Sequence, residues 1–277
     1  MENIKAKAFD LRKDTVDIIV AGNGGHIGGD MSVIDILISL YFCQMNISPD
    51  RLEDPDRDRF VLSKGHSVEA YYAVLAAKGF LNLEDVKANF SKFGSSYIGH
   101  PNNKLPGIEM NSGSLGHGLP VCVGMALAGK MDKRSYRVYT VMGDGELAEG
   151  SVWEGFMAGH QYQLDNLCAV IDRNHLQISG NTEDVMGHEK LAERISAFGW
   201  HVIEVTDGND LDQLNAAFEE AKTVKGQPTA VIANTIKGFG SSVMENKANW
   251  HHKVPTQEEY DQIIADFAKR KEALLHE

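Results

Sequence analysis

The sequence has few cysteines and a deficit of basic residues. Its three cysteines, Cys43, Cys122 and Cys168, sit singly in apolar surroundings without a C-x-x-C pair. Neither a disulfide framework nor a thiolate zinc site is therefore expected, and a reducing cytosol is the simplest compartment. Lysine and arginine number 27 against 39 acidic residues, a net charge of -12. This excess of negative charge argues against nucleic-acid binding, and an anionic ligand would need local cations or a metal.

The chain also lacks long apolar runs. Its longest nearly apolar run, at 118–129, is too short to cross a bilayer and predicts a helix buried on all sides. The N-terminus is charged and has no apolar region of the signal-peptide kind, so we expect no membrane association. With 277 residues, 43% of them hydrophobic, the chain is long enough for one large α/β domain.

Strands and helices alternate in the pattern of a parallel sheet covered on both faces. The apolar spacing predicts helices at 5–21, 32–42, 68–78, 148–162, 189–198, 211–223 and 256–275. It predicts strands, rich in Val and Ile in the later ones, at 59–63, 136–142, 166–172, 200–205 and 228–235. Residues 90–114 are rich in Gly, Ser, Asn and Pro and predict a long loop. We expect a single three-layer αβα domain over 1–277 with a mostly parallel central sheet.

Polar residues follow two of the predicted strands. The strand at 136–142 runs into Gly143-Asp144-Gly145, and the next strand along the chain is followed by Asn174, 30 positions after Asp144. Ligands of open parallel sheets bind at the carboxyl ends of the strands, so neighbouring strands would bring these side chains together. A carboxylate, an amide oxygen and a carbonyl from the next turn suit Mg2+ or Ca2+ held against a diphosphate. Taken alone, the GDG tripeptide favours an ordinary turn, and only its combination with Asn174 on the next strand favours a metal site.

The run from GDGELAEG to IDRN resembles the thiamine diphosphate motif. With NGGHIGGDMS, LSKGHS, IGHP, NSGSLGHGLPVCVGMA, NTIKGFGSS and NWHHKVP, nearly the whole chain resembles the N-terminal half of transketolase. The resemblance implies the diphosphate-binding domain of the thiamine diphosphate-binding fold. The pyrimidine-binding and C-terminal domains of the family have no counterpart here. The resemblance thus implies the N-terminal subunit of a split enzyme, active only with a C-terminal partner subunit, in a heterotetramer of two copies of each.

The resemblance also implies roles for particular residues. The metal would be held by Asp144, Asn174 and the carbonyl of Leu176. The cofactor would be bound by Ser114, Leu115, Gly116, Gly143, Gly145, Glu149, Ile178 and Lys237. Within this set, backbone N–H groups of Gly116 and Gly145 would meet phosphate oxygens, Lys237 would supply positive charge and Ile178 would pack against the thiazolium ring. Glu149 would couple two cofactor sites across a dimer interface, although a solvated glutamate in a first helical turn fits as well.

Four histidines match family positions that line the route to the cofactor: His26, His66, His100 and His251. Imidazole can donate, accept or transfer a proton near neutral pH, which suits the hydroxyl groups of a sugar. The resemblance assigns proton handling to His26 and His251, orientation of the donor sugar to His100 and a place nearer the cofactor to His66. His117, His175 and His252 stand near the predicted site without an assigned role. Ile27 and Asp30 depart from the family pattern.

The implied reaction transfers a two-carbon ketol unit from a ketose or ketose phosphate to an aldose or aldose phosphate. Alternatives are the corresponding subunit of a 1-deoxyxylulose-5-phosphate synthase-like enzyme or of a 2-oxoacid dehydrogenase (E1 alpha), and a non-catalytic regulatory descendant. The set of histidines together with LSKGH and NWHH favours ketol transfer, because decarboxylation of a 2-oxoacid has little use for so many sugar-facing imidazoles. The donor and acceptor sugars stay open.

Overall fold

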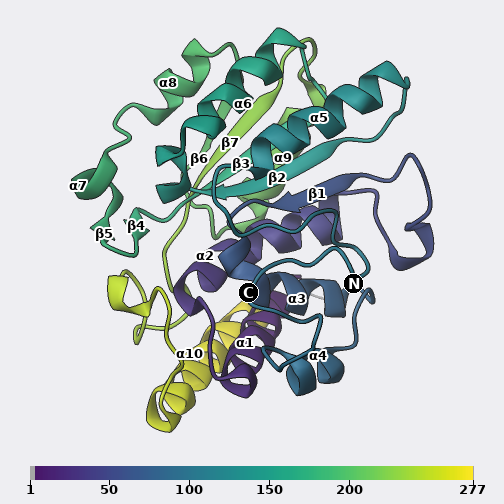
Figure 1. Cartoon of the computed structure of the whole chain (residues 1–277). Helices are drawn as coiled ribbons and strands as arrows, with labels where there is room; N and C mark the ends of the chain where they lie inside the picture. The colour runs from purple at the N-terminus through teal and green to yellow at the C-terminus, as the bar shows by residue number, and fades with distance from the viewer. Residues whose placement is uncertain (1–3, 277) are drawn as a thin grey trace.

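A five-stranded, fully parallel sheet forms the centre of the computed structural model, which describes residues 4–276 (Figure 1). Its strand order is β1-β2-β3-β7-β6. The strands are β1 (Arg59–Leu62), β2 (Val138–Gly143), β3 (Leu167–Arg173), β6 (His201–Val205) and β7 (Thr229–Asn234). Each lies within two residues of a predicted strand. The neighbouring strands β2 and β3 pair with Gly143 opposite Asp172, so both polar segments leave the sheet at the same edge.

Helices cover both faces of the sheet, which confirms the three-layer prediction. Along β3, Cys168 and Val170 pack toward one helical layer, whereas Ala169 and Ile171 pack toward the other. The first layer contains α2 (Ile27–Ile38), α3 (Val68–Ala77) and α9 (Leu211–Thr223). The second contains α5 (Gly118–Met131), α6 (Gly150–Gln161) and α8 (Leu191–Ala197).

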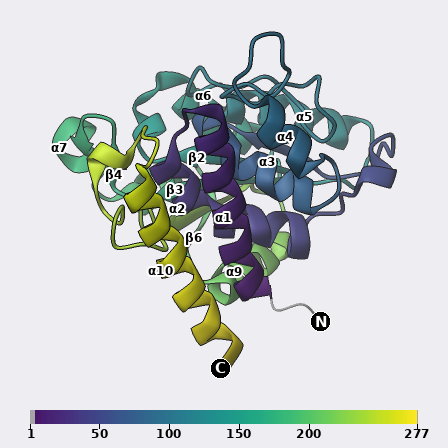
Figure 2. The same ribbon diagram turned by 90° about the horizontal axis from the view of Figure 1, so that it is seen from below.

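The first and last helices lie side by side outside the first layer. Figures 1 and 2 show α1 (Ile4–Gly22) next to α10 (Gln257–His276). Phe9 of α1 and Phe267 of α10 share a third apolar cluster with residues of α2. The remaining elements are α4 (Leu83–Asn89), α7 (Thr182–Met186), a hairpin of β4 (Leu176–Gln177) and β5 (Gly180–Asn181), a π-helical turn (Ser39–Gln44) and 3-10 turns at Pro49–Arg51, Gly65–Ser67, Gly145–Ala148 and Ala248–Trp250. The long loop predicted at 90–114 is confirmed.

The second predicted helix starts five residues earlier than expected. Gly28 and Gly29 lie inside α2, although glycine usually weakens a helix. A Cβ on Gly28 would lie 2.6 Å from the carbonyl oxygen of Trp250, so this glycine allows close packing between α2 and the segment after β7. The earlier start places His26 at the N-cap of the helix.

One burial prediction is wrong. The helix at 118–129 is buried on one side only, because Val121, Ala128 and Met131 on α5 are exposed. Cys43 is exposed as well, whereas Cys122 and Cys168 are buried. An apolar sequence pattern does not show whether a helix face is buried against the rest of the chain or exposed to solvent. One helical stretch, Ile27–Gln44, is apolar and long enough to cross a membrane, but 89% of it is buried as a core helix is.

Candidate active site

A cavity of about 310 Å³ opens at the carboxyl ends of β2, β3 and β7. It lies where an open parallel sheet binds its ligands. Most of the residues predicted from the sequence line it: His26, His66, Leu115, Gly143, Asp144, Gly145, Asn174, Leu176, Ile178, Lys237 and His251. His100 lies just outside this lining, with its ring 6.3 Å from that of His26. Ser114, Gly116 and Glu149 do not line the cavity.

Asp144 is a buried carboxylate fixed by the backbone around it. Its Oδ1 accepts the N–H of Gly145 at 2.8 Å, and its Oδ2 accepts the N–H of His175 at 2.7 Å. The hydroxyl of Thr182 donates to Oδ2 at 3.2 Å. Burial and the nearby carboxylate of Asp172 raise the pKa of Asp144 to about 6, although both N–H groups act against this. A cation beside Asp144 would lower the pKa and relieve the cost of the buried charge.

The turn after β3 brings two further predicted metal ligands, Asn174 and Leu176, to the lining of the cavity. Asn174 donates from Nδ2 to the hydroxyl of Ser32 at 3.2 Å, and its Oδ1 accepts the N–H of Leu176 at 3.2 Å. His175 has a positive φ of 61°, so the chain reverses there and continues into the β4–β5 hairpin. At the tip of this hairpin, Ile178 is 76% exposed.

A buried ion pair lies at the floor of the cavity. Lys64 donates to Asp172 at 2.6 Å and to the carbonyl of Gly29 at 3.1 Å. Asp172 also accepts the hydroxyls of Ser32, at 2.7 Å, and Thr235. The pair therefore ties the ends of β1, β3 and β7 to α2, and Lys64 adds a second cation to the cavity lining.

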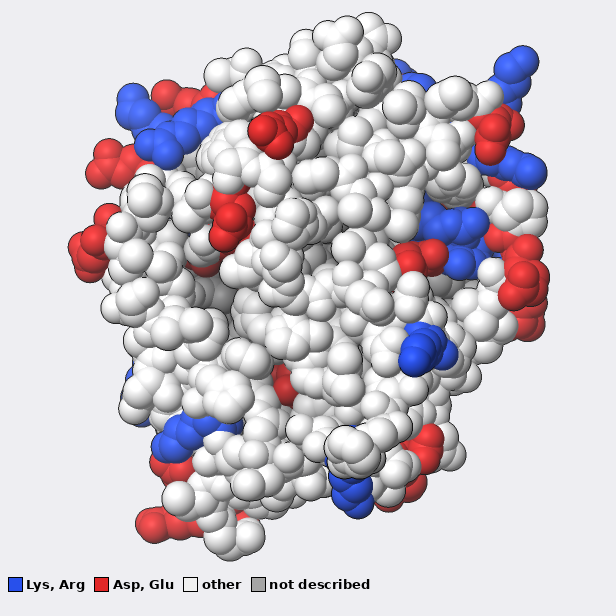
Figure 3. Space-filling model, in the orientation of Figure 1, with Lys and Arg blue, Asp and Glu red and all other residues white. Residues whose placement is uncertain are grey.

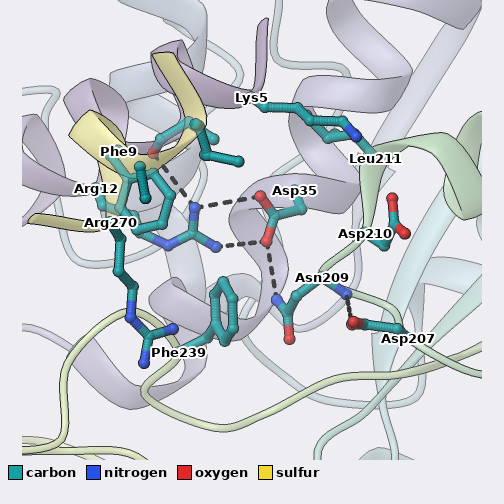
Figure 4. Close-up of a pocket in the computed structure, with 13 residues that line it drawn as sticks. Lys5, Phe9, Arg12, Asp35, Asp207, Asn209, Asp210, Leu211, Phe239 and Arg270 are labelled. Atoms are coloured by element: carbon teal, nitrogen blue, oxygen red, sulfur yellow. Dashed lines mark hydrogen bonds and ion pairs between the residues drawn. The ribbon is translucent and has the colours of Figure 1, made fainter. Parts of the chain in front are cut away.

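Lys237 follows a segment that a chain of buried and half-buried contacts joins to α1. The N–H of Ile236 donates to Oδ1 of Asn209 at 2.9 Å, and Nδ2 of Asn209 donates to Asp35 at 2.9 Å. Arg12 forms a two-pronged ion pair with the same carboxylate, as Figure 4 shows in a second cavity of about 460 Å³. Burial and the charge of Lys64 lower the pKa of Lys237 to about 8.

Five imidazoles gather at the mouth of the cavity. From the ring of His26, the centroids lie 5.2 Å away for His66, 6.3 Å for His100, 5.5 Å for His251 and 4.7 Å for His252. Burial, the other histidines and the two lysines lower the pKa of His26 to about 4 and that of His251 to about 3. Burial also lowers the pKa of His66 and His100. The rings of His26, His66, His100 and His251 are thus neutral near pH 7, able to donate from one nitrogen and accept at the other.

The tautomer of His251 follows from its neighbour. Lys237 lies with Nζ 2.7 Å from Nδ1 of His251 and 3.1 Å from the carbonyl oxygen of Leu176. Because a charged ammonium only donates, Nδ1 of His251 accepts and its ring proton lies on Nε2.

Glu146 occupies a place that the sequence analysis missed. This buried carboxylate accepts the N–H of Gly116 at 2.8 Å, the N–H of Gly143 at 3.1 Å and the hydroxyl of Ser63. The N–H of Gly116, expected to meet phosphate, therefore has an internal partner. Glu149 is exposed beside Gly116, where a Cβ on the glycine would lie 2.6 Å from that of Glu149.

Several lining residues were absent from the predicted set. They are Gly29, Lys64, Gly113, Glu146, Gln177 and Ser179. Most of them lie within the same motifs, so motif membership was the available signal for Gly29, Lys64, Gly113 and Glu146. Among residues 4–276, no group of three or more His, Cys, Asp or Glu side chains is placed to hold a metal. A metal at this cavity would use the carboxylate, amide and carbonyl oxygens around Asp144, which suit a hard cation.

Comparisons with known proteins agree with this geometry. Residues 4–270 match the family model described as transketolase, thiamine diphosphate binding domain. The chain is 48% identical to an apulose-4-phosphate transketolase subunit of Phocaeicola vulgatus, covering 100% of this chain and 98% of that protein. It is 39% identical to the 6-deoxy-6-sulfo-D-fructose transketolase subunit SqwG of a Clostridium species, with 96% and 97% covered.

The solved transketolase from Leishmania mexicana superimposes with a TM-score of 0.87 at 29% identity, covering 100% of this chain and 45% of that one. This chain thus spans less than half the length of that transketolase. The fold and the cavity define a thiamine diphosphate-binding domain. The chain belongs to the transketolase family, and it matches the members named as subunits over nearly their full length.

Proposed function

We propose that this chain is the N-terminal subunit of a split transketolase, which transfers a two-carbon ketol unit from a ketose phosphate to an aldose phosphate. The observation that carries the proposal is one cavity that joins the oxygens of Asp144, Asn174 and Leu176 to two lysines and the histidine cluster. The same histidines disfavour a 2-oxoacid decarboxylating site, whose substrate has no row of hydroxyl groups to orient.

The residues at the cavity fit thiamine diphosphate with Mg2+, or with Ca2+. Asp144, Asn174 and the carbonyl of Leu176 would hold the metal, and Lys237 would bind the diphosphate. The N–H of Gly145, expected to meet phosphate, donates to Asp144 instead. The raised pKa of Asp144 supports this fit, since a divalent ion stabilises the charged carboxylate. When bound, the cofactor supplies the nucleophilic carbon and the electron sink for ketol transfer.

The histidines would act on the sugar. His26 and His251 are neutral and lie 5.5 Å apart between ring centroids, so one can accept a hydroxyl proton while the other donates to a neighbouring oxygen. His251 would offer Nε2–H, because its Nδ1 faces Lys237. His66 and His100 would orient the donor sugar alongside them.

A partner subunit would complete the site. In transketolases the pyrimidine-binding domain lies beyond the portion matched here, and the relatives from Phocaeicola and Clostridium are both named as subunits. Val121 on α5 and Met157 on α6 are exposed apolar side chains. Figure 3 shows few charged side chains on the part of the surface over α5 and α6. This face would bury against the C-terminal subunit, and against a second copy of the chain, where Glu149 would meet its counterpart.

The names of the two relatives point to donors that carry an anionic group, a phosphate in apulose-4-phosphate and a sulfonate in 6-deoxy-6-sulfo-D-fructose. One relative named for apulose-4-phosphate is 48% identical, so this compound is the first donor to assay. The unpaired cysteines fit the reducing cytosol as the proposed compartment.

Co-expression tests the proposal. Ketol transfer is assayed with the purified chain alone, with a co-expressed pyrimidine-domain subunit, and with only that partner present. The proposal expects turnover only when both chains, thiamine diphosphate and Mg2+ are present. Full activity of the single chain contradicts the split assembly, and decarboxylation of a 2-oxoacid without ketol transfer contradicts the reaction.

A further inference from the structure

Two carboxylic acids lie fully buried behind the histidine cluster. Asp30 belongs to the first turn of α2, and Glu69 belongs to the first turn of α3. Neither side chain is exposed to solvent, and the two carboxyl groups interact directly with each other. Oδ1 of Asp30 accepts the N–H of Ala70 at 3.0 Å. Oδ2 of Asp30 and both carboxyl oxygens of Glu69 have no donor partner as long as both groups are ionised.

One proton shared between the two carboxyl groups would relieve both their repulsion and their lack of hydrogen-bond donors. Two adjacent buried carboxylates would repel each other and would leave three oxygens without donors, which is costly on both counts. With one proton, one acid donates to the other and a single negative charge is left. Burial raises the pKa of Asp30 to about 7, and burial with the charge of Asp30 raises the pKa of Glu69 well above its ordinary value.

The charged and titratable groups that face the pair come from three directions. Lys64 faces Asp30 from the turn after β1 and favours its ionised form. Tyr72 faces Glu69 from the same helix, and the N–H of His26 faces Glu69 from the turn before α2. Lys64 is already paired with Asp172, so its charge is shared with another carboxylate.

The pair connects the two turns that carry His26 and His66. Asp30 lies one helical turn after His26, and Glu69 lies three residues after His66. The carboxyl of Glu69 packs against the backbone before His26, because a Cβ on Gly25 would lie 2.7 Å from its Oε1. The two imidazole rings are 5.2 Å apart between centroids, so any separation of α2 from α3 changes their spacing.

We propose that Asp30 and Glu69 share one proton and act together as positioning residues that hold His26 and His66 at the spacing required by the sugar. This inference rests on the proposed function for its catalytic consequence, whereas the shared proton is a property of the folded chain. Neither residue lines the cavity itself, so neither is a catalytic residue.

The shared proton is tested by stability against pH. Asp30 keeps its proton in the folded chain up to about pH 7 and loses it in the unfolded chain near its ordinary pKa of 3.8. The pair therefore contributes stability at low pH, and this contribution declines as pH rises from about 3.8 to about 7.

D30N removes the proton while keeping a donor toward Glu69. Between pH 5 and 7, urea unfolding should show the unfolding constant of wild type rising relative to D30N by about tenfold per pH unit. E69Q should behave alike, and E84Q, at an exposed glutamate of α4, should follow wild type. If the ratio of the unfolding constant of wild type to that of each amide variant did not change with pH, the shared proton would be overturned.

The positioning role is tested with the assembled enzyme. D30N and E69Q keep the link between the two turns and should retain most of kcat/KM, whereas D30A and E69A break it and should lose about 100-fold. Thiamine diphosphate affinity by calorimetry should not change in any of the four variants. Equal activity of the alanine and amide variants would overturn the positioning role. An inactive wild-type assembly would contradict the proposed function instead, and the unfolding measurements would still decide the shared proton.

Discussion

The carboxylate of Asp144 accepts the backbone N–H of His175 at 2.7 Å, which joins the turns after two neighbouring parallel strands. This contact fixes the distance between the GDG turn and the turn that carries Asn174. Side chains 30 positions apart in the sequence thereby face one cavity. The proposed metal site is a consequence of strand order rather than of a local motif.

Asp144→Asn should separate ligand binding from stability. We expect Mg2+ and cofactor affinity to fall by about 100-fold or more, because the amide removes the only carboxylate of the proposed metal site. Removing a buried charge offsets the lost hydrogen bond to Gly145, so stability at pH 7 should stay within about 1 kcal/mol of wild type. Calorimetry and urea unfolding check both expectations, with the exposed Asp212→Asn as control. Unchanged Mg2+ affinity would contradict the assignment.

Lys237 predicts a pH-dependent cofactor affinity. Because its pKa is about 8, the ammonium is charged at pH 7 and is largely neutral at pH 9. Cofactor binding should therefore weaken as pH rises through 8, and Lys237→Met should weaken it at pH 7 and remove most of this pH dependence. Calorimetry at pH 7, 8 and 9 makes the comparison. The same pH dependence in the variant as in wild type would assign the effect to another group.

His26 and His251 should remain neutral across the physiological range. In the chain without cofactor, the pKa of His26 is about 4 and that of His251 about 3, both below their ordinary 6.5. A depressed histidine pKa contributes stability that is present above pH 6.5 and is lost as pH falls toward the folded-state values. Imidazole NMR resonances should show no protonation of these rings between pH 6 and 8. A titration midpoint near 6.5 for either ring would show that the cluster is open to water.

The exposed side of α5 and α6 should be an interface. Val121→Glu and Met157→Glu place a charge on exposed apolar positions and should disrupt assembly with the partner subunit while leaving the fold intact. Leu275→Glu, at an exposed position of α10, is the matched control. Light scattering after size exclusion measures the assembly, and thermal unfolding measures the fold. Wild-type assembly by both interface variants would place the contact elsewhere.

The sequence predicted the sheet and most of the residues that line the cavity, because strand ends and motifs can be read from short segments of the chain. It failed where packing between distant segments decides the outcome. Glu146 and Lys64 are charged residues whose burial follows from partners such as Ser63 and Asp172. The contact between Asp30 and Glu69 likewise appears only when α2 and α3 are placed together. The exposed side of α5 was misjudged because apolar composition fits a core and an interface equally well.

The most direct test of the account is an anomalous-scattering map of the assembled enzyme with thiamine diphosphate, in which Mn2+ replaces Mg2+. We expect one strong peak per chain bonded to Asp144, Asn174 and the carbonyl oxygen of Leu176, with the diphosphate on its far side. Bound cofactor with the metal peak away from these three oxygens would contradict it.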